Sequence, residues 1–163
     1  MKRALLLAVL LLLVPVVVRA ECADAPAPNV DWGRCFLDGR DFKGADLSKM
    51  QMRGAQFLRA DFTDAKLIKT DATRAKFNAA TLTGADLAGA RLQEADFSST
   101  AAERASFKGA DLRSAKFIDA DLKGADFTGA QVRATDFFRA DLSGARWTDG
   151  TKICAAGSIG SCQ

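Results

Sequence analysis

Residues 115–129 read AKFID-ADLKG-ADFTG, three consecutive units of five residues. Each unit has Ala in the first position, a larger apolar residue in the third and Gly or Asp in the last. The same register continues in both directions, with apolar centres at every fifth position from Leu37 to Trp147, which makes 23 units. A period of five fits neither a helix of 3.6 residues per turn nor the two-residue alternation of a strand, so an ordinary amphipathic element is excluded.

The composition of the units indicates which positions face inward. Nine centres are Phe and nine are Leu, and Ala stands two residues before the centre in 17 of the 23 units. Residues two apart point to the same side of an extended chain, so the small and the large residue face inward together. The residue between them, which is Asp in eleven units, faces outward. Gly in the last position of many units, as in Gly44 and Gly124, suits a tight corner with positive φ.

The units resemble the A(D/N)LXX motif of the pentapeptide repeat proteins, as in Ala45-Asp46-Leu47, Ala85-Asp86-Leu87 and Ala125-Asp126-Phe127. The resemblance covers Cys35 to Asp149. It implies an all-β fold, a right-handed quadrilateral β-helix with about 20 residues in each coil. The 23 units would then make a little under six coils.

The sequence supports a structural period of twenty residues independently. When the centres are sorted by that period, one of the four sides becomes an almost pure Phe column. Phe and Leu would be shuffled among the sides if the period were different. The rings in this column would stack at about 4.8 Å, the spacing of neighbouring strands. The column consists of Leu37, Phe57, Phe77, Phe97, Phe117 and Phe137.

The N-terminal residues 1–20 are predicted to be a secretory signal peptide. Lys2 and Arg3 precede a run without charge over residues 4–18, and small residues flank Arg19 at the expected cleavage site. A membrane anchor is the alternative, but the run is shorter than the roughly 20 apolar residues that span a bilayer, and Pro15 interrupts it. We therefore expect a mature chain that begins at Glu21, is exported to the periplasm or secreted by a bacterium, and has no stable membrane anchor.

All four cysteines lie outside the regular units or at their edge. Lipid attachment at Cys22 is disfavoured because Glu21 precedes it in place of a small residue. An even number of cysteines in an exported chain indicates disulfides, and four allow three connectivities. Local pairing of Cys22 with Cys35 and of Cys154 with Cys162 is favoured, because each disulfide then fastens one end of the expected β-helix and none runs along its length. The expected organisation is a signal peptide (1–20), an N-terminal cap (21–36), the repeat β-helix (37–149) and a C-terminal cap (150–163).

Charge and composition narrow the possible functions. The formal charge is +3, with 23 basic and 20 acidic residues, and the pI is about 8.8. Lys2, Arg3 and Arg19 all belong to the predicted signal peptide, which has no acid, so the remaining chain is formally neutral. A nucleic-acid partner is therefore not expected. The chain has no His, which removes His-activated nucleophiles and His metal ligands. We expect a protein that is not an enzyme and has no cofactor or metal.

Several outward-facing groups could still carry a function. On one side, Asp41 lies beside Asp61 and Asp121 beside Asp141; such pairs could bind a cation or act in acid and base catalysis, although local hydrogen bonding to the backbone is the simpler interpretation. The side of the Phe column has alternating charges that should form exposed ion pairs. A third side carries a stripe of arginines that could attract an anionic partner. The alternating charges are Lys76, Asp96, Lys116 and Asp136, and the stripe is Arg53, Arg113 and Arg133 with Arg91 nearby.

An apolar strip is the candidate partner surface. Leu58, Ile118 and Phe138 follow the centres of the Phe column and should point outward, which can mark a docking surface or a dimer seam. The leading hypothesis is a non-catalytic exported scaffold whose flat faces bind an unknown protein or a second copy. As the alternative, some pentapeptide repeat proteins mimic duplex DNA and protect DNA gyrase. The signal peptide, the neutral charge of the mature chain and the absence of an inserted loop in the repeat oppose that alternative. An enzyme that used the paired Asp residues would lack a cleft.

Overall fold

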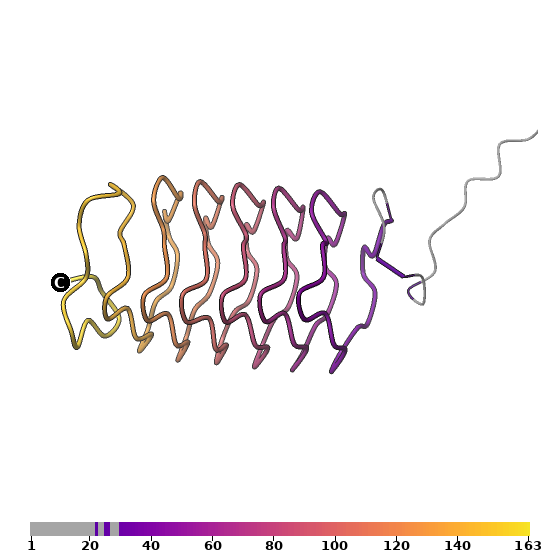
Figure 1. The fold of residues 1–163 in the computed structure, drawn as a ribbon, viewed down its shortest axis with the longest axis horizontal. Helices are drawn as coiled ribbons and strands as arrows, with labels where there is room; N and C mark the ends of the chain where they lie inside the picture. Colours follow the sequence, from indigo (N-terminus) through magenta and orange to yellow (C-terminus); the bar gives the residue numbers. More distant parts are fainter. Residues whose placement is uncertain (1–21, 23–24, 27–29) are drawn as a thin grey trace, which may run out of the picture.

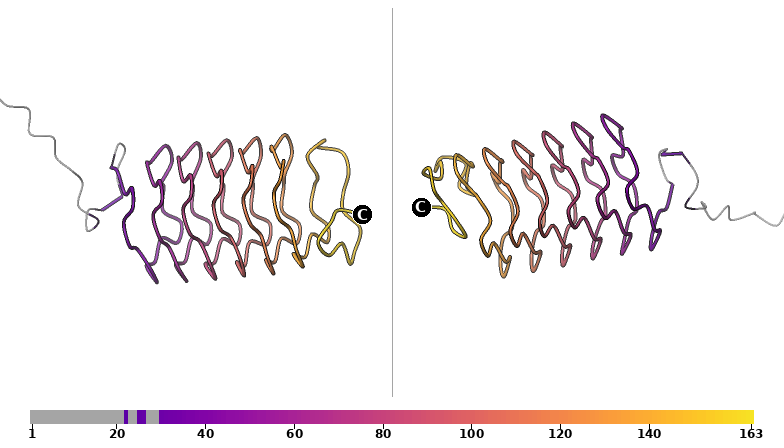
Figure 2. Two further views of the ribbon diagram at one scale, coloured as in Figure 1. Left: turned by 180° about the vertical axis from the view of Figure 1, so that it is seen from behind. Right: turned by 90° about the horizontal axis from the view of Figure 1, so that it is seen from below.

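The computed structural model describes residues 22, 25–26 and 30–163. The chain winds into a straight rod of similar coils, each stacked on the one before, with the C-terminus at one end (Figure 1). The two further views in Figure 2 show the same coils from behind and from below. Within the described residues there is no helix, and each extended piece is a single bridge residue between turns.

Four ladders of parallel bridges hold the coils together, and every bridge of these ladders joins residues twenty apart. This is the period expected from the Phe column. We name the sides after the ladders: side A begins at Asp31, side B at Phe36, side C at Asp41 and side D at Asp46. In every unit the bridge residue is the one between the two inward-facing residues, so its side chain points away from the core.

The core consists of the paired small and large residues of each unit. On side B the rings of Phe77 and Phe97 lie 4.8 Å apart at an interplanar angle of 1°, and those of Phe97 and Phe117 lie 4.8 Å apart at 6°. Phe107 and Phe127 on side D stack in the same way at 5.2 Å. Across the core, Phe97 meets the edge of Phe107 at 82°. All five rings are fully buried.

The corners between sides have one backbone conformation. The last residue of each unit has a positive φ from Arg34 to Gly144, and this includes 14 residues that are not Gly, such as Ala79 with φ 56°. The preceding turn is closed by a hydrogen bond from the next small residue to the centre carbonyl, as from Ala80 N to Phe77 O at 2.9 Å. The structure therefore requires the positive φ that the glycines indicate, even where a side chain is present.

The rod also includes a unit that the expected boundary places in the N-terminal cap. Asp31 bridges Gln51, and the N–H of Trp32 donates to the Gln51 carbonyl at 2.8 Å. Trp32 is fully buried, and its ring lies 5.4 Å from that of Phe42 at an interplanar angle of 43°. Val30 stands where most units have Ala, which hides this unit from the pattern. A disulfide joins Cys22 to Cys35 at this end.

The C-terminal segment folds back over the end of the last coil. Ile153 forms an antiparallel bridge with Arg146 on side D, and Ile159 forms one with Asp141 on side C. A disulfide joins Cys154 to Cys162 within this segment. We call residues 150–163 the C-terminal cap. Both disulfides are the local pairs expected from the sequence.

Candidate interaction surfaces

The outward Asp residues serve the corners of the coil. In all twelve units that have Asp at the bridge position, the unit of Trp32 included, its Oδ1 accepts a hydrogen bond from the backbone N–H two residues later, as from Thr63 to Asp61 at 2.8 Å and from Ser98 to Asp96 at 2.9 Å. This bond satisfies an N–H that the ladders do not use. The repeated Asp is therefore explained by local structure.

One of the two carboxylate pairs of side C is occupied by a lysine. Asp121 and Asp141 lie on adjacent coils, and the ammonium group of Lys123 lies between them, at 2.8 Å from Asp121 and 3.3 Å from Asp141. Among residues 30–163 and the few described residues before them, no cluster of acidic, Cys or His side chains has the arrangement of a metal site. The lysine neutralises this pair, whereas Asp41 and Asp61 accept hydrogen bonds from the backbone N–H groups of Lys43 and Thr63 and have no ion pair within the described residues.

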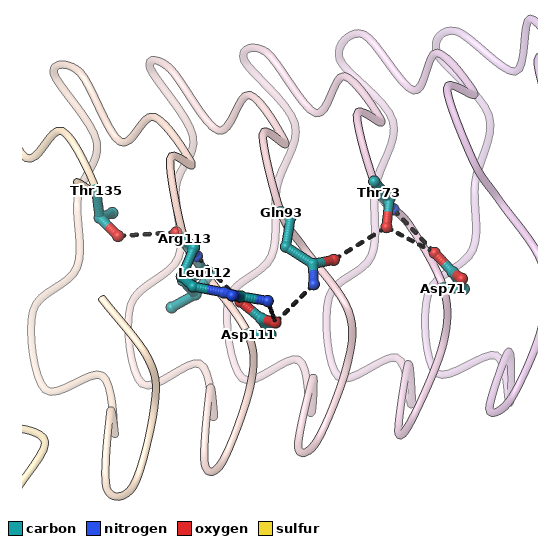
Figure 3. A network of polar contacts seen from close by, with 7 residues as sticks. All are labelled: Asp71, Thr73, Gln93, Asp111, Leu112, Arg113 and Thr135. Atoms are coloured by element: carbon teal, nitrogen blue, oxygen red, sulfur yellow. Dashed lines mark hydrogen bonds and ion pairs between the residues drawn. The ribbon is translucent and has the colours of Figure 1, made fainter. Parts of the chain in front are cut away.

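Side A carries a chain of polar contacts that runs along the rod axis (Figure 3). The hydroxyl of Thr73 donates to Asp71 at 2.8 Å and lies 3.1 Å from the Gln93 side-chain oxygen. The Gln93 amide donates to Asp111 at 2.6 Å, and the Arg113 guanidinium makes two hydrogen bonds to the same carboxylate. These contacts tie several coils together on their outer surface.

Asp71 is the buried member of this chain. It is only 4% exposed, and the Arg53 guanidinium lies 2.7 Å from its Oδ2. Burial raises the pKa of the Asp71 carboxyl, but the hydrogen bonds from Arg53 and Thr73 outweigh burial and hold this pKa below its ordinary value. The Arg113 hydrogen bond lowers the pKa of Asp111 in the same way. Both carboxylates stay ionised at neutral pH.

The arginine stripe is partly neutralised on its own side. Arg53 and Arg91 lie 2.7 Å and 3.5 Å from Asp71, and Arg113 pairs with Asp111. An attractive field for an anionic partner would require uncompensated arginines. The four arginines therefore face two carboxylates, because Arg53 and Arg91 share Asp71 and Arg133 on the last coil has no ion pair within the described residues.

The alternating charges of side B are neighbours without being ion pairs. Lys76, Asp96, Lys116 and Asp136 form consecutive bridges, as the period requires. However, no ion pair within the described residues joins any two of them, so the expected ladder of salt bridges is wrong. Asp96 instead receives its hydrogen bonds from Ser98. Long exposed lysines gain little from pairing and lose side-chain freedom when they pair.

The predicted apolar strip lies on side B as expected, but it is not continuous. Phe138 is 62% exposed, whereas Leu58 and Ile118 are half-buried. Asn78 and Ser98 occupy the same outward position on the coils between Leu58 and Ile118. Two apolar regions therefore stand at the two ends of side B, separated by a polar middle.

Phe36 is an exposed aromatic residue that the pattern missed. It is 71% exposed at the first bridge position of side B, on the coil before Leu58. Its place between Cys35 and Leu37 is an outward position of the repeat, and this was the signal that could have identified it. A depression of about 450 Å³ lies over the same end of side B, lined by Asp38, Gly39, Leu58, Arg59, Asn78 and Ala79.

The predicted signal peptide lies outside the described residues. Within the described part, no helix is long and apolar enough to cross a membrane.

The repeat, the four ladders and the corner geometry define a class of protein, the four-sided solenoids built from five-residue units. The family model for pentapeptide repeats matches this sequence in overlapping segments over residues 41–78, 55–93, 90–129 and 105–144. These segments cover more than half of the chain, so the protein belongs to the pentapeptide repeat family, whose members form right-handed quadrilateral β-helices. No curated protein sequence matches the chain.

Solved structures with a similar fold come from the same family. QnrB1, a plasmid-mediated fluoroquinolone resistance protein, is 20% identical with a TM-score of 0.46, over 69% of this chain and 74% of its own. A pentapeptide repeat protein of the Arabidopsis thaliana thylakoid lumen is 24% identical with a TM-score of 0.35, over 77% of this chain and 81% of its own. Rfr23 of the cyanobacterium Cyanothece 51142 is 21% identical with a TM-score of 0.31, over 62% and 79%.

Proposed function

We propose that this protein is an exported, non-catalytic scaffold, a rod of about six coils, that binds another protein along side B. The observation that carries the proposal is the exposure of aromatic residues at both ends of that side, Phe36 at 71% and Phe138 at 62%. Large exposed apolar groups on one face of a soluble protein are typical of a partner surface. The other two exposed large apolar residues of the described chain, Ile153 and Ile159, lie in the C-terminal cap and not along the coils, which favours side B.

The length of the rod supports a protein partner over a small ligand. Phe36 and Phe138 are five coils apart in the ladder, which corresponds to about 24 Å at the spacing of neighbouring strands. A small molecule cannot contact both ends of such a side, whereas a folded partner or an extended chain can. We propose that Phe36 with Leu58 and Ile118 with Phe138 form two anchoring points on the same partner.

A photo-crosslinking amino acid at position 118 tests this proposal in the compartment where the protein resides. We expect an adduct with one other protein that is lost when Phe36 is replaced by Asp, because the second anchoring point is then charged. Ser98→Asp is the matched control, since Ser98 has the same outward position as Ile118 on the preceding coil. A failure to form any adduct, or an adduct that persists in Phe36→Asp, would reject the two-point surface.

Export is part of the proposal and has a separate test. The N-terminal pattern of residues 1–20 supports it, and so do two disulfides, which persist in oxidising compartments. Fractionation of the source cells followed by mass spectrometry is expected to find a mature chain that begins at Glu21 outside the cytoplasm. A chain that begins at Met1 in the cytoplasm would contradict export.

The distribution of surface charges argues against the alternative that the protein mimics DNA. Duplex DNA presents an unbroken series of negative charges. On side A the carboxylates of Asp71 and Asp111 each pair with an arginine, and on side C Lys123 lies between Asp121 and Asp141. Neither side presents a continuous negative stripe. A gyrase supercoiling assay with the mature chain is expected to show no inhibition.

A further inference from the structure

The charges of side B are left without partners inside the chain. Side B has three outward rows along the rod: the bridge residues, the residues that follow the centres and the corner residues with positive φ. We number its coils from one, at Phe36, to six, at Asp136. Coils three to six carry alternating charges in the bridge row, and no ion pair within the described residues includes any of them. Such a series can pair with a surface that carries the reverse order.

Side B also combines a hollow with protruding apolar groups. The depression of about 450 Å³ lies over its first three coils and is lined by Leu58, Arg59 and Asn78 among others. At the other end, Ile118 and Phe138 follow the centres of the fifth and sixth coils, and Phe138 is 62% exposed. A hollow at one end and an exposed ring at the other make this side complementary to a reversed copy of itself.

We propose that the partner of side B is a second copy of this chain, packed side to side in the opposite direction. The inference rests on the proposed function, because it names the occupant of the two anchoring points. The two-fold axis lies in the contact plane, parallel to the strands, and crosses side B between its third and fourth coils. Rotation about this axis reverses the order of the coils and places each row opposite the same row of the second copy. Such a contact closes, so the assembly stops at two.

The rotation places opposite charges face to face. The third coil faces the fourth, so Lys76 lies opposite the second copy's Asp96, and the same pair recurs across the axis. In the corner row, Arg59 on the second coil lies opposite the second copy's Asp119 on the fifth. Arg59 has no ion pair within the described residues, and Asp119 is bound by Arg139 of its own chain at 2.8 Å. The pairing therefore neutralises charges that the single chain leaves exposed.

The apolar groups of the two ends meet in the same register. Leu58 on the second coil lies opposite the second copy's Ile118 on the fifth. Phe138 on the sixth coil lies opposite the first coil, where the depression begins and Phe36 is exposed. Each contact occurs twice, once at either end of the pair. Both ends of side B therefore bury apolar surface that is exposed in the single chain.

Other registers are less favourable. Moving the axis by half a coil toward the C-terminus places Lys76 opposite Lys116 and Asp96 opposite its own copy. Moving it by half a coil the other way places Lys76 opposite its own copy. A shift of the axis by a whole coil in either direction separates Leu58 from the second copy's Ile118. Because like charges face to face are destabilising, the central register is selected.

Side B is a narrow surface, so the pair is weak. Its six coils span about 24 Å, and its width is that of one short strand and a turn. The contact area per copy is therefore below the roughly 800 Å² of a standard interface. We expect a dimer that dissociates on dilution.

Two charge reversals test the inference in the full mature chain by sedimentation velocity over a wide concentration range. Lys76→Asp places carboxylates opposite carboxylates, and Asp96→Lys places ammonium groups opposite ammonium groups, each at two equivalent positions. We expect either variant alone to raise the dissociation constant about tenfold. The mixed dimer of the two variants is expected to recover the parent's dissociation constant, because acidic groups then face basic groups. Lys66→Asp is the matched control, because Lys66 is an exposed bridge residue of side D between Asp46 and Asp86.

The outcomes of this experiment are distinct. A monomer at all concentrations, a dimer that is insensitive to both reversals, or a mixture that stays monomeric would each overturn the inference. Recovery in the mixture supports it and also shows that both variants are folded, so misfolding does not explain the weaker pairing of each variant alone.

The photo-crosslinking amino acid at position 118 separates this inference from the proposed function. An adduct with twice the mass of the mature chain, joined near Leu58 of the second copy, supports both. An adduct with a different protein overturns the inference and leaves the proposed function in place. The absence of any adduct rejects both.

Discussion

At the residue scale, the corners explain both the glycines and the residues that replace them. The last position of a unit has φ near +60° whether it is Gly44, with φ 63°, or Ala79, with φ 56°. Positive φ raises the conformational free energy of a residue with a side chain by about 1 to 2 kcal/mol. Gly has no such penalty, but it loses more backbone entropy on folding. The fold therefore tolerates a strained residue at many corners because the ladders on both sides fix the chain.

This strain predicts a reciprocal pair of substitutions. Ala79→Gly is expected to stabilise the protein by about 0.5 to 1 kcal/mol, because it removes a positive-φ side chain from an exposed corner. Gly44→Ala is expected to destabilise it by about 1 kcal/mol for conformational reasons alone, since no atom lies within 4 Å of the added Cβ. Urea unfolding measures both. Equal effects of the same sign would contradict the strain argument.

Asp71 gives a prediction that depends on pH. Its folded-state pKa is lowered, so its contribution to stability is present above the unfolded-state value of about 3.9 and is lost as pH falls through the folded-state pKa. Asp71→Asn is expected to cost about 1 to 2 kcal/mol at pH 7, because solvent screens Arg53, which is 64% exposed.

We expect the difference between Asp71→Asn and the parent to shrink below about pH 4, where the parent loses the same charge. Unfolding free energies measured across the acid range check this. Asp86→Asn is the control, because Asp86 makes the same backbone hydrogen bond but has no ion pair within the described residues. A deficit that stays constant down to pH 2 would mean that the cost of Asp71→Asn is steric.

At the scale of elements, the cap differs from the coils that it covers. A coil is held on every side by its neighbours, whereas residues 150–163 are held by a few hydrogen bonds to sides C and D and by the bond between Cys154 and Cys162. This segment has no Ala-Asp-Leu signature, so the period could not predict its antiparallel path or its hydrogen bonds to sides C and D. The unit at Trp32 was missed for a related reason, since Val30 is larger than the usual Ala.

Removing the C-terminal disulfide tests how the cap is held. Replacing Cys154 and Cys162 by Ser is expected to destabilise the cap by about 2 to 3 kcal/mol in the chain-entropy estimate for a loop of this length. Amide exchange at Leu142, Gly144 and Trp147, which donate to the cap, is expected to accelerate while exchange at Phe97 is unchanged. The same replacement at Cys22 and Cys35 is the control and leaves these three amides slow. Unchanged exchange would show that the cap is held without the disulfide.

At the scale of the whole molecule, the fold was predictable because one register runs through the whole repeat. Twenty-residue sorting predicted the Phe column, and the structure confirms its stacked rings at 4.8 Å. Surface pairing was not predictable to the same degree. Lys123, which follows its centre, lies between two carboxylates, whereas Lys76, at a bridge position next to Asp96, forms no ion pair within the described residues, and the repeat alone predicts neither outcome. Periodicity therefore determines the backbone and the core but not the surface contacts.

Deletions of different length test the twenty-residue period. Removal of residues 77–96, one complete coil, keeps every column in register, and we expect a cooperative thermal transition with a slightly lower midpoint. Removal of the single unit 77–81 moves every later centre to a neighbouring side and separates Phe57 from Phe97 and Phe117. We expect it to lower the midpoint far more, as followed by circular dichroism. Similar transitions for the two deletions would show that the sides are interchangeable.

The regularity of the ladders has a further consequence for any molecule that lies along the rod. Neighbouring coils look alike from outside, so a partner that recognised only the repeat could slide by one coil, about 4.8 Å, at almost no cost. Departures from the repeat remove this ambiguity. Phe36 and Phe138 are two exposed aromatic residues at fixed positions on an otherwise repetitive side. A partner that contacts both can bind in one alignment, because a shift by one coil would lose both contacts.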